Sequence, residues 1–344
     1  MRKNILTILI GTLLLMCAAG YGIWQHYNTP QARLERAKIY NNRAADLSND
    51  GQDWKAIYYY TKAIKLNPNY ATAYYGRGTA KNNIGYFKSA IEDLDRAIQI
   101  NPKYASAYNN RGYSKNNTGD YEGALADTTR ALELNPKNSY AYSNRGIAKY
   151  NLKDFAGAVA DYNSSIALDN KNPRVYTNRG NAKESLKDYE GALADHTHSL
   201  SLNPRNAGAY NNRAIVRDSL KDYEGALADY TQALELSPRY ADAYQNRGIT
   251  YNHLKNYQQA LNNFNRALSL KPNFALAYQN RGQAKAGLRD FYGALADFDT
   301  ALQLDNTLAD AYRYRADVKE LLGDTNAAVE DRQAARRLER NNAE

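Results

Sequence analysis

One arginine recurs every 34 residues along this 344-residue chain, and acidic residues follow it at a constant spacing. Sixteen residues after most of these arginines stands an aspartate, which Tyr59 and Asn263 replace once each. A guanidinium and a carboxylate held at constant spacing can form a bidentate ion pair. We therefore predict an ion pair that joins two segments of each repeat, with binding of an anionic partner as the alternative. The arginines are Arg43, Arg77, Arg111, Arg145, Arg179, Arg213, Arg247, Arg281 and Arg315, and the aspartates are Asp93, Asp127, Asp161, Asp195, Asp229, Asp297 and Asp331.

The residue directly before this arginine is an asparagine in most repeats, and its chemistry suits the binding of a peptide. A carboxamide offers a donor and an acceptor together, so it can pair with a peptide main chain whatever side chains the peptide carries. The alternative is that these asparagines bond to one another or to neighbouring backbone. We call them the asparagine ladder, which consists of Asn42, Asn110, Asn144, Asn178, Asn212, Asn246 and Asn280.

Other polar residues stand near the ladder and give the expected binding groove a nearly uncharged lining. Such a lining favours an extended peptide as the ligand. It lacks the lysines that a carboxylate clamp for chaperone tails would need, so we disfavour that mode of binding. The further residues predicted to contact the peptide are Asn109, Tyr113, Asn181, Asn211, Gln245 and Gln279, with Thr177 and Gln283 beside them.

Residue types that catalyse reactions or bind metals are sparse, and their spacing does not indicate a site. His196 and His198 lie two residues apart, so on a helix they point to different sides. Cys17 is the one cysteine of the sequence. The sequence also has no phosphate-binding glycine loop and no nucleophile elbow. We therefore predict no enzyme activity, no metal and no cofactor, and we do not expect a small-molecule ligand.

Two helices in each repeat are the elements that must position these side chains. In the repeat spanning residues 105–138, apolar and small residues follow two helical stripes. Gly112 and Ala124 are small enough to let neighbouring helices approach closely. Gly119 can adopt the left-handed conformation that ends the first helix, and Asp120 is a suitable N-cap for the second. The pattern therefore predicts a helical hairpin that is repeated nine times.

This pattern resembles the tetratricopeptide repeat (TPR) family, in which an aromatic residue, small residues and a closing proline recur with this period. Tyr108, Gly112, Ala124 and Pro136 occupy these positions in one repeat. The resemblance implies an all-α solenoid of nine repeats over residues 37–342, ending in a degenerate cap. It also implies a right-handed superhelix whose first helices line a concave groove. The asparagine ladder is similar to that of the glycosyltransferases that attach O-linked N-acetylglucosamine, and we expect no catalytic domain beside it here.

The charge of the chain does not favour a nucleic-acid partner. The formal net charge is +9, with 45 Lys and Arg against 36 Asp and Glu. The two signs are interspersed, and basic residues do not alternate with aromatic residues as single-strand binders require. We therefore predict a protein or peptide client.

An apolar segment near the start predicts a membrane-inserting helix. Arg2 and Lys3 precede an uncharged stretch at residues 5–24, which as a helix would span about 30 Å. We divide the chain into a transmembrane anchor or signal segment at 1–30, a short linker at 31–36 and the repeats at 37–342. A cleaved secretory signal is the alternative to an anchor. Both interpretations place the repeats outside the cytoplasm, anchored to the membrane in one case and secreted or periplasmic in the other.

The function predicted from these features is that of a scaffold or adaptor. Its groove would bind an extended segment of a client protein, in the assembly of a bacterial cell-envelope complex. The alternative is a structural brace that contacts its partners through the convex surface or the end caps. The two functions differ in whether the groove asparagines or the outer helices matter for binding.

Overall fold

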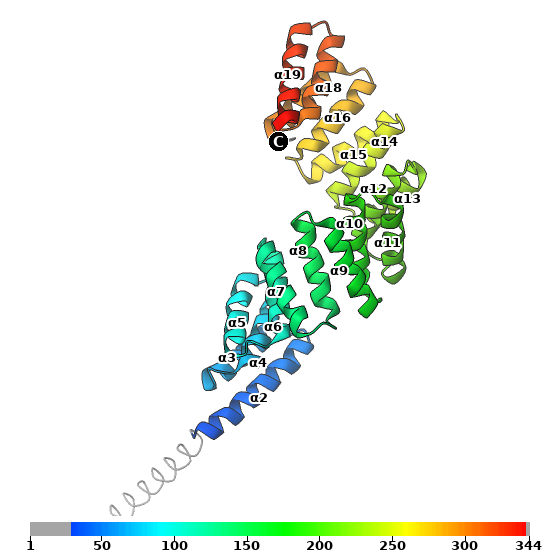
Figure 1. The fold of residues 1–344 in the computed structure, drawn as a ribbon. Coiled ribbons are helices and arrows are strands. Elements are labelled where there is room, and N and C mark those ends of the chain that lie inside the picture. The colour runs from blue at the N-terminus through cyan, green and yellow to red at the C-terminus, as the bar shows by residue number, and fades with distance from the viewer. Residues whose placement is uncertain (1–28, 342–344) are drawn as a thin grey trace, which may run out of the picture. The chain divides into compact units, whose positions relative to one another are not determined.

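The computed structural model describes residues 29–341, which are all helical apart from short turns. The chain divides into two compact parts. In the N-terminal part, up to Asn170, the helices are α2 (Pro30–Asn49), α3 (Asp53–Leu66), α4 (Ala71–Asn83), α5 (Phe87–Ile100), α6 (Ala105–Thr118), α7 (Tyr121–Leu134), α8 (Ser139–Asn151) and α9 (Phe155–Leu168) (Figure 1). In the C-terminal part, from Lys171, they are α10 (Pro173–Ser185), α11 (Tyr189–Leu202), α12 (Ala207–Ser219), α13 (Tyr223–Leu236), α14 (Ala241–His253), α15 (Tyr257–Leu270), α16 (Ala275–Gly287), α17 (Phe291–Leu304), α18 (Ala309–Leu321) and α19 (Thr325–Asn341).

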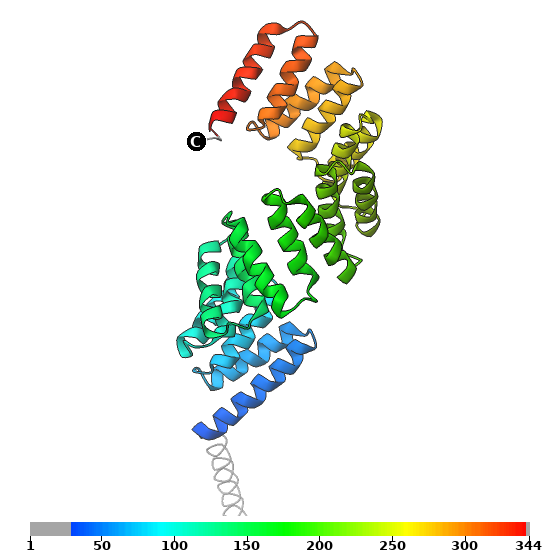
Figure 2. The same cartoon turned by 45° about the vertical axis from the view of Figure 1, so that its right-hand side comes forward.

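The described residues confirm the predicted repeat of two helices. Each even-numbered helix is the first helix of a repeat, and the odd-numbered helix after it packs back along it as the second helix (Figures 1 and 2). The last hairpin, α18 and α19, covers the end of the C-terminal part. The chain is therefore an all-α solenoid of tandem hairpins.

The predicted linker at residues 31–36 is wrong, because these residues form the first turns of α2. Thr29 is the N-cap, and its hydroxyl accepts a hydrogen bond from the Ala32 amide at 3.2 Å. Pro30 occupies the first helical position, where its missing N–H is not needed. No glycine or proline interrupts the sequence from there to Asn49, so the helix continues into the first repeat.

The predicted anchor or signal segment at 5–24 lies outside the described residues. From residue 29 to residue 341, every helix is too short or too polar to cross a lipid bilayer.

Within each part, neighbouring first helices contact one another and neighbouring second helices do not. In the N-terminal part α4 contacts α6 and α6 contacts α8, whereas α5, α7 and α9 are separated from one another. The same holds in the C-terminal part for α10, α12, α14, α16 and α18. First helices that lie closer together than second helices form the inner layer of a curved stack. We call the surface that they present the inner face, and the surface of the second helices the outer face.

The hairpin turns follow the predicted chemistry. Gly119 ends α6 with φ +84°, and the Asp120 carboxylate accepts a hydrogen bond from the Gly123 amide at 3.0 Å to cap α7. Asp154, Asp188, Asp222 and Asp290 cap later second helices in the same way. Each cap satisfies one of the free amides at a helix start.

Five of these turns place a basic residue in the left-handed conformation instead of a glycine. They are Lys153, Lys187, Lys221, Lys255 and Arg289, with φ between 56° and 64°. A side chain in this conformation costs about 1–2 kcal/mol relative to glycine. We expect Lys221→Gly to raise the free energy of unfolding by about 1 kcal/mol and Gly119→Lys to lower it by a similar amount. Urea unfolding checks this pair, and equal midpoints for both variants and the wild type would contradict it.

The core is built from small residues on the first helix and larger ones on the second. A Cβ atom at Gly146 would lie 2.6 Å from the ring of Tyr162, and one at Gly248 would lie 2.6 Å from Phe264. These contacts leave no room for any side chain but hydrogen. The first helix is therefore held tightly against the second, which fixes the orientation of the polar residues on its inner face.

Candidate functional site

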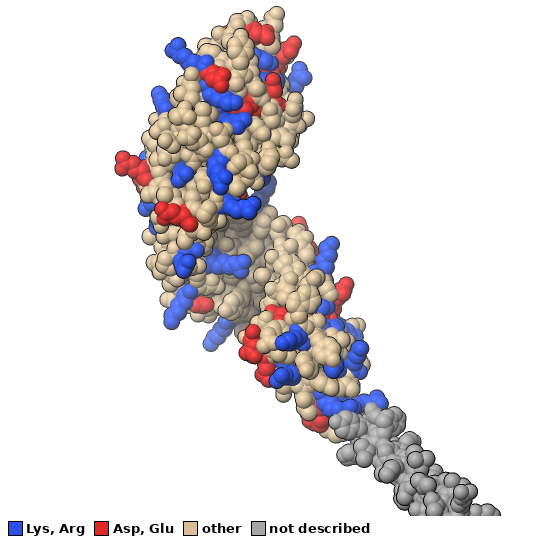
Figure 3. Space-filling model, turned by 180° about the vertical axis from the view of Figure 1, so that it is seen from behind, with Lys and Arg blue, Asp and Glu red and all other residues tan. Residues whose placement is uncertain are grey.

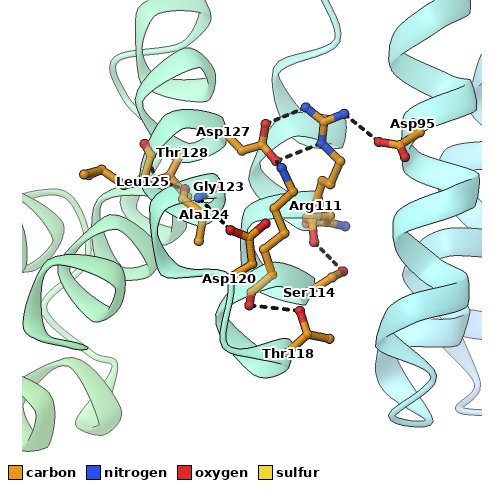
Figure 4. A network of polar contacts seen from close by, with 12 residues as sticks. Asp95, Arg111, Ser114, Thr118, Asp120, Gly123, Ala124, Leu125, Asp127 and Thr128 are labelled. Atoms are coloured by element: carbon orange, nitrogen blue, oxygen red, sulfur yellow. Dashed lines mark hydrogen bonds and ion pairs between the residues drawn. The ribbon is translucent and has the colours of Figure 1, made fainter. Parts of the chain in front are cut away.

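A network of three charged groups joins the first and second helices in seven of the described repeats. Arg111 Nε donates to Asp127 Oδ2 at 2.8 Å, and its terminal nitrogen lies 2.5 Å from Oδ1 (Figure 4). Lys115 Nζ lies 3.0 Å from Asp127 Oδ2. The predicted ion pair between the two helices is thus confirmed, with a lysine as an additional member. We call this arrangement the Arg–Lys–Asp triad.

The lysine of the triad could also have been predicted from the sequence, although the spacing of arginine and aspartate alone does not indicate it. A lysine or arginine stands four residues after the repeated arginine in all the repeats that have the aspartate. The two repeats that lack the aspartate also lack this cation. Leu47 stands at the cation position in the repeat with Tyr59, and Tyr251 stands there in the repeat with Asn263. The cation and the aspartate vary together because each neutralises the other. The cations are Lys81, Lys115, Lys149, Lys183, Arg217, Lys285 and Lys319, and each one lies within 3.0 Å of its aspartate.

The repeated arginine also contacts the preceding repeat. Arg111 donates to Asp95 at 2.6 Å (Figure 4), and Arg315 donates to Asp299 at 2.6 Å. The guanidinium of Arg145 lies 5.5 Å from the ring centre of Tyr142, a cation–π distance that recurs in other repeats. The hydrogen bond with Asp161 raises the pKa of Arg145. These contacts engage the guanidinium groups within the fold and do not favour the alternative of an anionic partner.

In the N-terminal part, two members of the asparagine ladder join neighbouring first helices. Asn110 Nδ2 donates to Thr79 Oγ1 at 2.8 Å, and Asn144 Nδ2 donates to Asn109 Oδ1 at 3.0 Å. Asn42 is exposed on α2, and its oxygen is 3.5 Å from the side-chain nitrogen of Asn41. Each carboxamide of Asn110 and Asn144 therefore contributes to the stacking of repeats and is also half-exposed on the inner face.

In the C-terminal part, two more members of the ladder make the same kind of bond. Asn212 Nδ2 donates to Asn181 Oδ1 at 2.9 Å, and Asn246 Nδ2 donates to Asn211 Oδ1 at 3.2 Å. These bonds agree with the alternative that ladder asparagines bond to one another. They engage the amide nitrogens of Asn212 and Asn246, and the oxygen of Asn212 also accepts from Asn211 Nδ2 at 3.3 Å.

Asn178 and Asn280 differ from the other members of the ladder. Both are half-buried on the inner face, and neither side chain hydrogen-bonds to another of the described residues. The backbone carbonyl of Asn280 accepts a hydrogen bond from Asn252 at 3.0 Å. Two carboxamides on the C-terminal part therefore have donors and acceptors that no described residue pairs with.

The residue directly before the ladder position lies between the first helices rather than on the open inner face. Asn109, Asn211, Gln245 and Gln279 are all buried, because this position points toward the next first helix. The side-chain oxygens of Gln245 and Gln279 have no donor among the described residues. Tyr113 and Asn181, which are half-buried, remain near the surface. Tyr113 packs edge-on against Phe87 with ring centres 6.0 Å apart.

A cavity of about 570 Å³ opens beside the end of the ladder in the C-terminal part. First helices α14, α16 and α18 supply most of its wall, and aromatic residues of α15 and α17 supply the rest, among them Tyr257, Phe291 and Phe298. This cavity could not be predicted from the sequence, since its residues come from three repeats and share no motif.

Charged side chains of both signs are interspersed on the face of the molecule seen in Figure 3. Blue and red atoms alternate there with large uncharged areas, and no continuous basic track is seen on this face. A nucleic-acid-binding surface would carry a continuous basic patch, so this distribution does not favour a nucleic-acid partner.

Tandem hairpins with small residues facing large ones define a helical-repeat solenoid. Models of single repeats of the tetratricopeptide family match residues 105–138, 173–206 and 241–274, and a model described as a TPR repeat matches 83–117 and 219–255. Residues 83–138, 173–206 and 219–274 are therefore tetratricopeptide repeats. A search of curated protein sequences finds no match to it.

Solved structures support the fold. The APC/C hetero-tetramer Cut9-Hcn1 is similar with a TM-score of 0.63 and 16% identity, over 80% of this chain and 54% of that one. A tetratricopeptide repeat protein from Parabacteroides merdae has a TM-score of 0.55 and 22% identity, over 74% and 98% of the two chains. Yeast Tom70 has a TM-score of 0.51 and 16% identity, over 88% and 85%. These structures share the helical-repeat fold of this chain.

Proposed function

We propose that the inner face binds an extended peptide segment of a client protein. The observation that carries this proposal is the pair of unpaired, half-buried carboxamides of Asn178 and Asn280. The side-chain N and O atoms of these two residues are not among the buried unpaired atoms, so they are accessible to a ligand. A peptide main chain supplies an N–H and a C=O with every residue, so it can pair with both amides without a requirement for particular side chains.

The spacing of the first helices matches an extended peptide. Packed helices lie about 8–10 Å apart, and an extended chain advances about 3.3–3.6 Å per residue. One ladder asparagine would therefore meet about every third residue of the client. In the C-terminal part, α10, α12, α14 and α16 each contribute one such asparagine, namely Asn178, Asn212, Asn246 and Asn280. A segment of about 10–12 residues would contact all four.

A structural brace is the second candidate function, and two observations favour it. Four members of the ladder already use their amide nitrogens to join repeats. On the outer face, Trp54 of α3 is 63% exposed and packs edge-on against Tyr86, with ring centres 5.3 Å apart. Exposed aromatic residues are common at protein interfaces. Under this alternative, partners contact the second helices and the inner face stays empty.

The cellular setting remains part of the proposal. We infer from the apolar sequence at 5–24 that the chain is inserted in or exported across a membrane, with the repeats on the outer side. The proposed role is assembly of a cell-envelope complex by binding one of its proteins. No catalytic step is proposed.

Selection of peptides on the full-length chain in detergent tests the peptide-binding function. A display library of random 12-residue peptides is passed over the immobilised protein, and the enriched peptides are synthesised and titrated. We expect Asn178→Ala with Asn280→Ala to weaken their binding by about tenfold, since each lost hydrogen bond is worth about 0.5–1.5 kcal/mol. Neither substitution removes a side-chain hydrogen bond within the described residues.

Matched control variants separate binding from folding. Thr231→Ala on the outer face of α13 should leave the affinity unchanged. Its hydroxyl donates to the Leu227 carbonyl and accepts from Arg247, so this variant loses more contacts within the fold than the double variant does. If enriched peptides bind the Asn178 and Asn280 double variant as tightly as the wild type, the inner face is not the binding surface and the structural brace is favoured.

A further inference from the structure

The cavity at the end of the ladder is lined by acidic, amide and aromatic side chains. On α18, Asp310, Tyr314 and Asp317 lie four and three residues apart, so they share one side of the helix. Residues of α14 and α16 also line the cavity, and Figure 1 shows α16 beside α18. With a volume of about 570 Å³, the cavity has the size of a binding pocket.

The wall is acidic although the chain as a whole is basic. Two aspartates line the cavity, and no lysine or arginine does. Each aspartate has an arginine partner at the surface: Arg313 pairs with Asp310, and Arg332 lies 3.2 Å from Asp317.

These two arginines are shared with other carboxylates. Arg313 also lies 3.3 Å from Glu339, and Arg332 also pairs with Glu320. Four carboxylates of α18 and α19, two of which line the cavity, therefore share two guanidinium groups. The pairs are exposed, with Asp317 63% accessible, so they contribute little and can rearrange around an incoming cation.

A buried amide in the cavity wall lacks a hydrogen-bond donor. Gln279 is only 7% exposed, and its Oε1 atom has no partner among the described residues. The side-chain oxygen of Asn252, which also lines the cavity, is buried without a donor as well. Unpaired buried acceptors are costly unless a partner supplies an N–H. The cavity is therefore suited to a ligand with several donors.

Aromatic rings complete the wall. Tyr314 stacks on Phe298 with ring centres 6.2 Å apart and planes inclined by 29°. Tyr257 packs against Gly287, where a Cβ atom would lie 2.6 Å from its ring. Any side chain at position 287 would displace the Tyr257 ring from its position beside the cavity. Flat aromatic rings beside carboxylates bind a guanidinium well, because that group is planar and stacks on them.

The cavity also marks the point at which the ladder stops. Tyr314 stands at the ladder position of the ninth repeat, one repeat beyond Asn280. Asp317 stands where earlier repeats have Gln283 and Ile249. A peptide that follows the ladder through the C-terminal part would arrive here with one side chain beside α18.

We propose that this cavity binds an arginine side chain of the client peptide. The guanidinium would lie against the rings and pair with Asp310 and Asp317, and the Gln279 amide would turn toward the cavity to accept a hydrogen bond from it. This inference rests on the proposed peptide-binding function and adds to it a specificity pocket. It predicts that clients carry one arginine at a fixed position relative to the segment held by the ladder.

The test uses the same full-length chain in detergent and the same random 12-residue library. Enriched peptides should share an arginine. Replacing that arginine by citrulline, which has nearly the same shape but no charge, should weaken binding by at least tenfold. Asp317→Asn should weaken binding of the arginine peptide by five- to tenfold and change binding of the citrulline peptide by less than twofold.

Asp242→Asn is the matched control for Asp310→Asn. Asp242 occupies the same repeat position two repeats earlier, is exposed, and does not line the cavity. Asp310→Asn should weaken binding of the arginine peptide, and Asp242→Asn should leave this binding unchanged. A thermal melt of each variant shows whether it is folded.

Several results would overturn the pocket while leaving the peptide-binding function intact. One is a set of peptides that need Asn178 and Asn280 but share no arginine. Another is equal affinity for the arginine, lysine and citrulline peptides, and a third is an effect of Asp242→Asn as large as that of Asp310→Asn. If the library yields no binding peptide at all, both the pocket and the proposed function are overturned.

Discussion

Replacing Asp161 by alanine is expected to lower the free energy of unfolding by about 3–5 kcal/mol. The carboxylate is 3% exposed and accepts hydrogen bonds from Arg145 Nε at 2.9 Å and from its terminal nitrogen at 2.6 Å. Lys149 Nζ lies 2.8 Å away from Oδ2 of the same carboxylate. Without the aspartate, two cations face each other at a largely buried site with no counter-charge.

The arginine and the lysine should matter less than the aspartate. Arg145→Ala leaves Asp161 paired with Lys149, and Lys149→Ala leaves it paired with Arg145. We expect each of these changes to cost about 1–3 kcal/mol. Urea unfolding followed by circular dichroism gives all three values, and hydrogen exchange of α8 and α9 shows whether the loss is local.

The seventh repeat provides a matched rescue for this experiment. There Asn263 replaces the aspartate, Tyr251 replaces the lysine, and Arg247 Nε donates to Asn263 Oδ1 at 2.8 Å. Asp161→Asn combined with Lys149→Tyr should therefore recover most of the stability that Asp161→Asn alone removes. Equal stability of the wild type and Asp161→Ala would show that the triad is not what holds the two helices together.

His196→Phe is expected to reduce the loss of stability of the protein between pH 6.5 and pH 4. His196 has no exposed surface, and neither ring nitrogen has a hydrogen-bond partner among the described residues. Burial lowers the pKa of His196 to about 4. The folded state therefore holds the neutral ring at pH values where the unfolded chain, with an ordinary pKa of about 6.5, binds a proton.

The direction of this effect follows from proton binding. As the pH falls below 6.5, the unfolded state gains a proton that the folded state does not, so stability decreases until about pH 4. The difference in pKa corresponds to about 3 kcal/mol. Phenylalanine fits the site, because Phe264 and Phe298 pack at the same repeat position against the same repeated glycine.

Urea unfolding at pH 4 and pH 7 measures the effect. The wild type should lose about 3 kcal/mol more than His196→Phe between the two pH values. His198→Gln, which changes an exposed histidine on the same helix, should retain the pH dependence of the wild type. If His196→Phe loses as much stability on acidification as the wild type, the histidine is not held neutral by burial.

The fold could be predicted from the sequence because the same local signals recur in every repeat. Gly119 and Asp120 mark one hairpin turn, and equivalent residues mark the others, so many repeats support each boundary. The ion pair of Arg111 and Asp127 followed from its constant spacing. The start of α2 could not be predicted in this way, because Thr29 and Pro30 lie before the repeated pattern begins and signal a helix start only once.

The site was harder to predict, because spacing along the chain does not show how side chains pack between repeats. Asn109 and Asn110 are adjacent, yet one is buried between helices and the other is half-exposed on the inner face. Hydrogen bonds such as that of Asn212 with Asn181 depend on how one repeat stacks on the next. The acidic cavity depends on residues such as Asp317, which depart from the repeated pattern and so appear in sequence as isolated differences.

Photo-cross-linking of a selected peptide tests most directly whether the inner face is the binding surface. Benzoylphenylalanine is placed at successive positions of the peptide, the complex with the full-length chain is irradiated, and the cross-linked residues are identified by mass spectrometry. Binding along the ladder predicts that the cross-links fall on first helices α10, α12, α14 and α16, in the order of the peptide sequence. Cross-links confined to second helices α11, α13 and α15 would contradict it and place the client on the outer face.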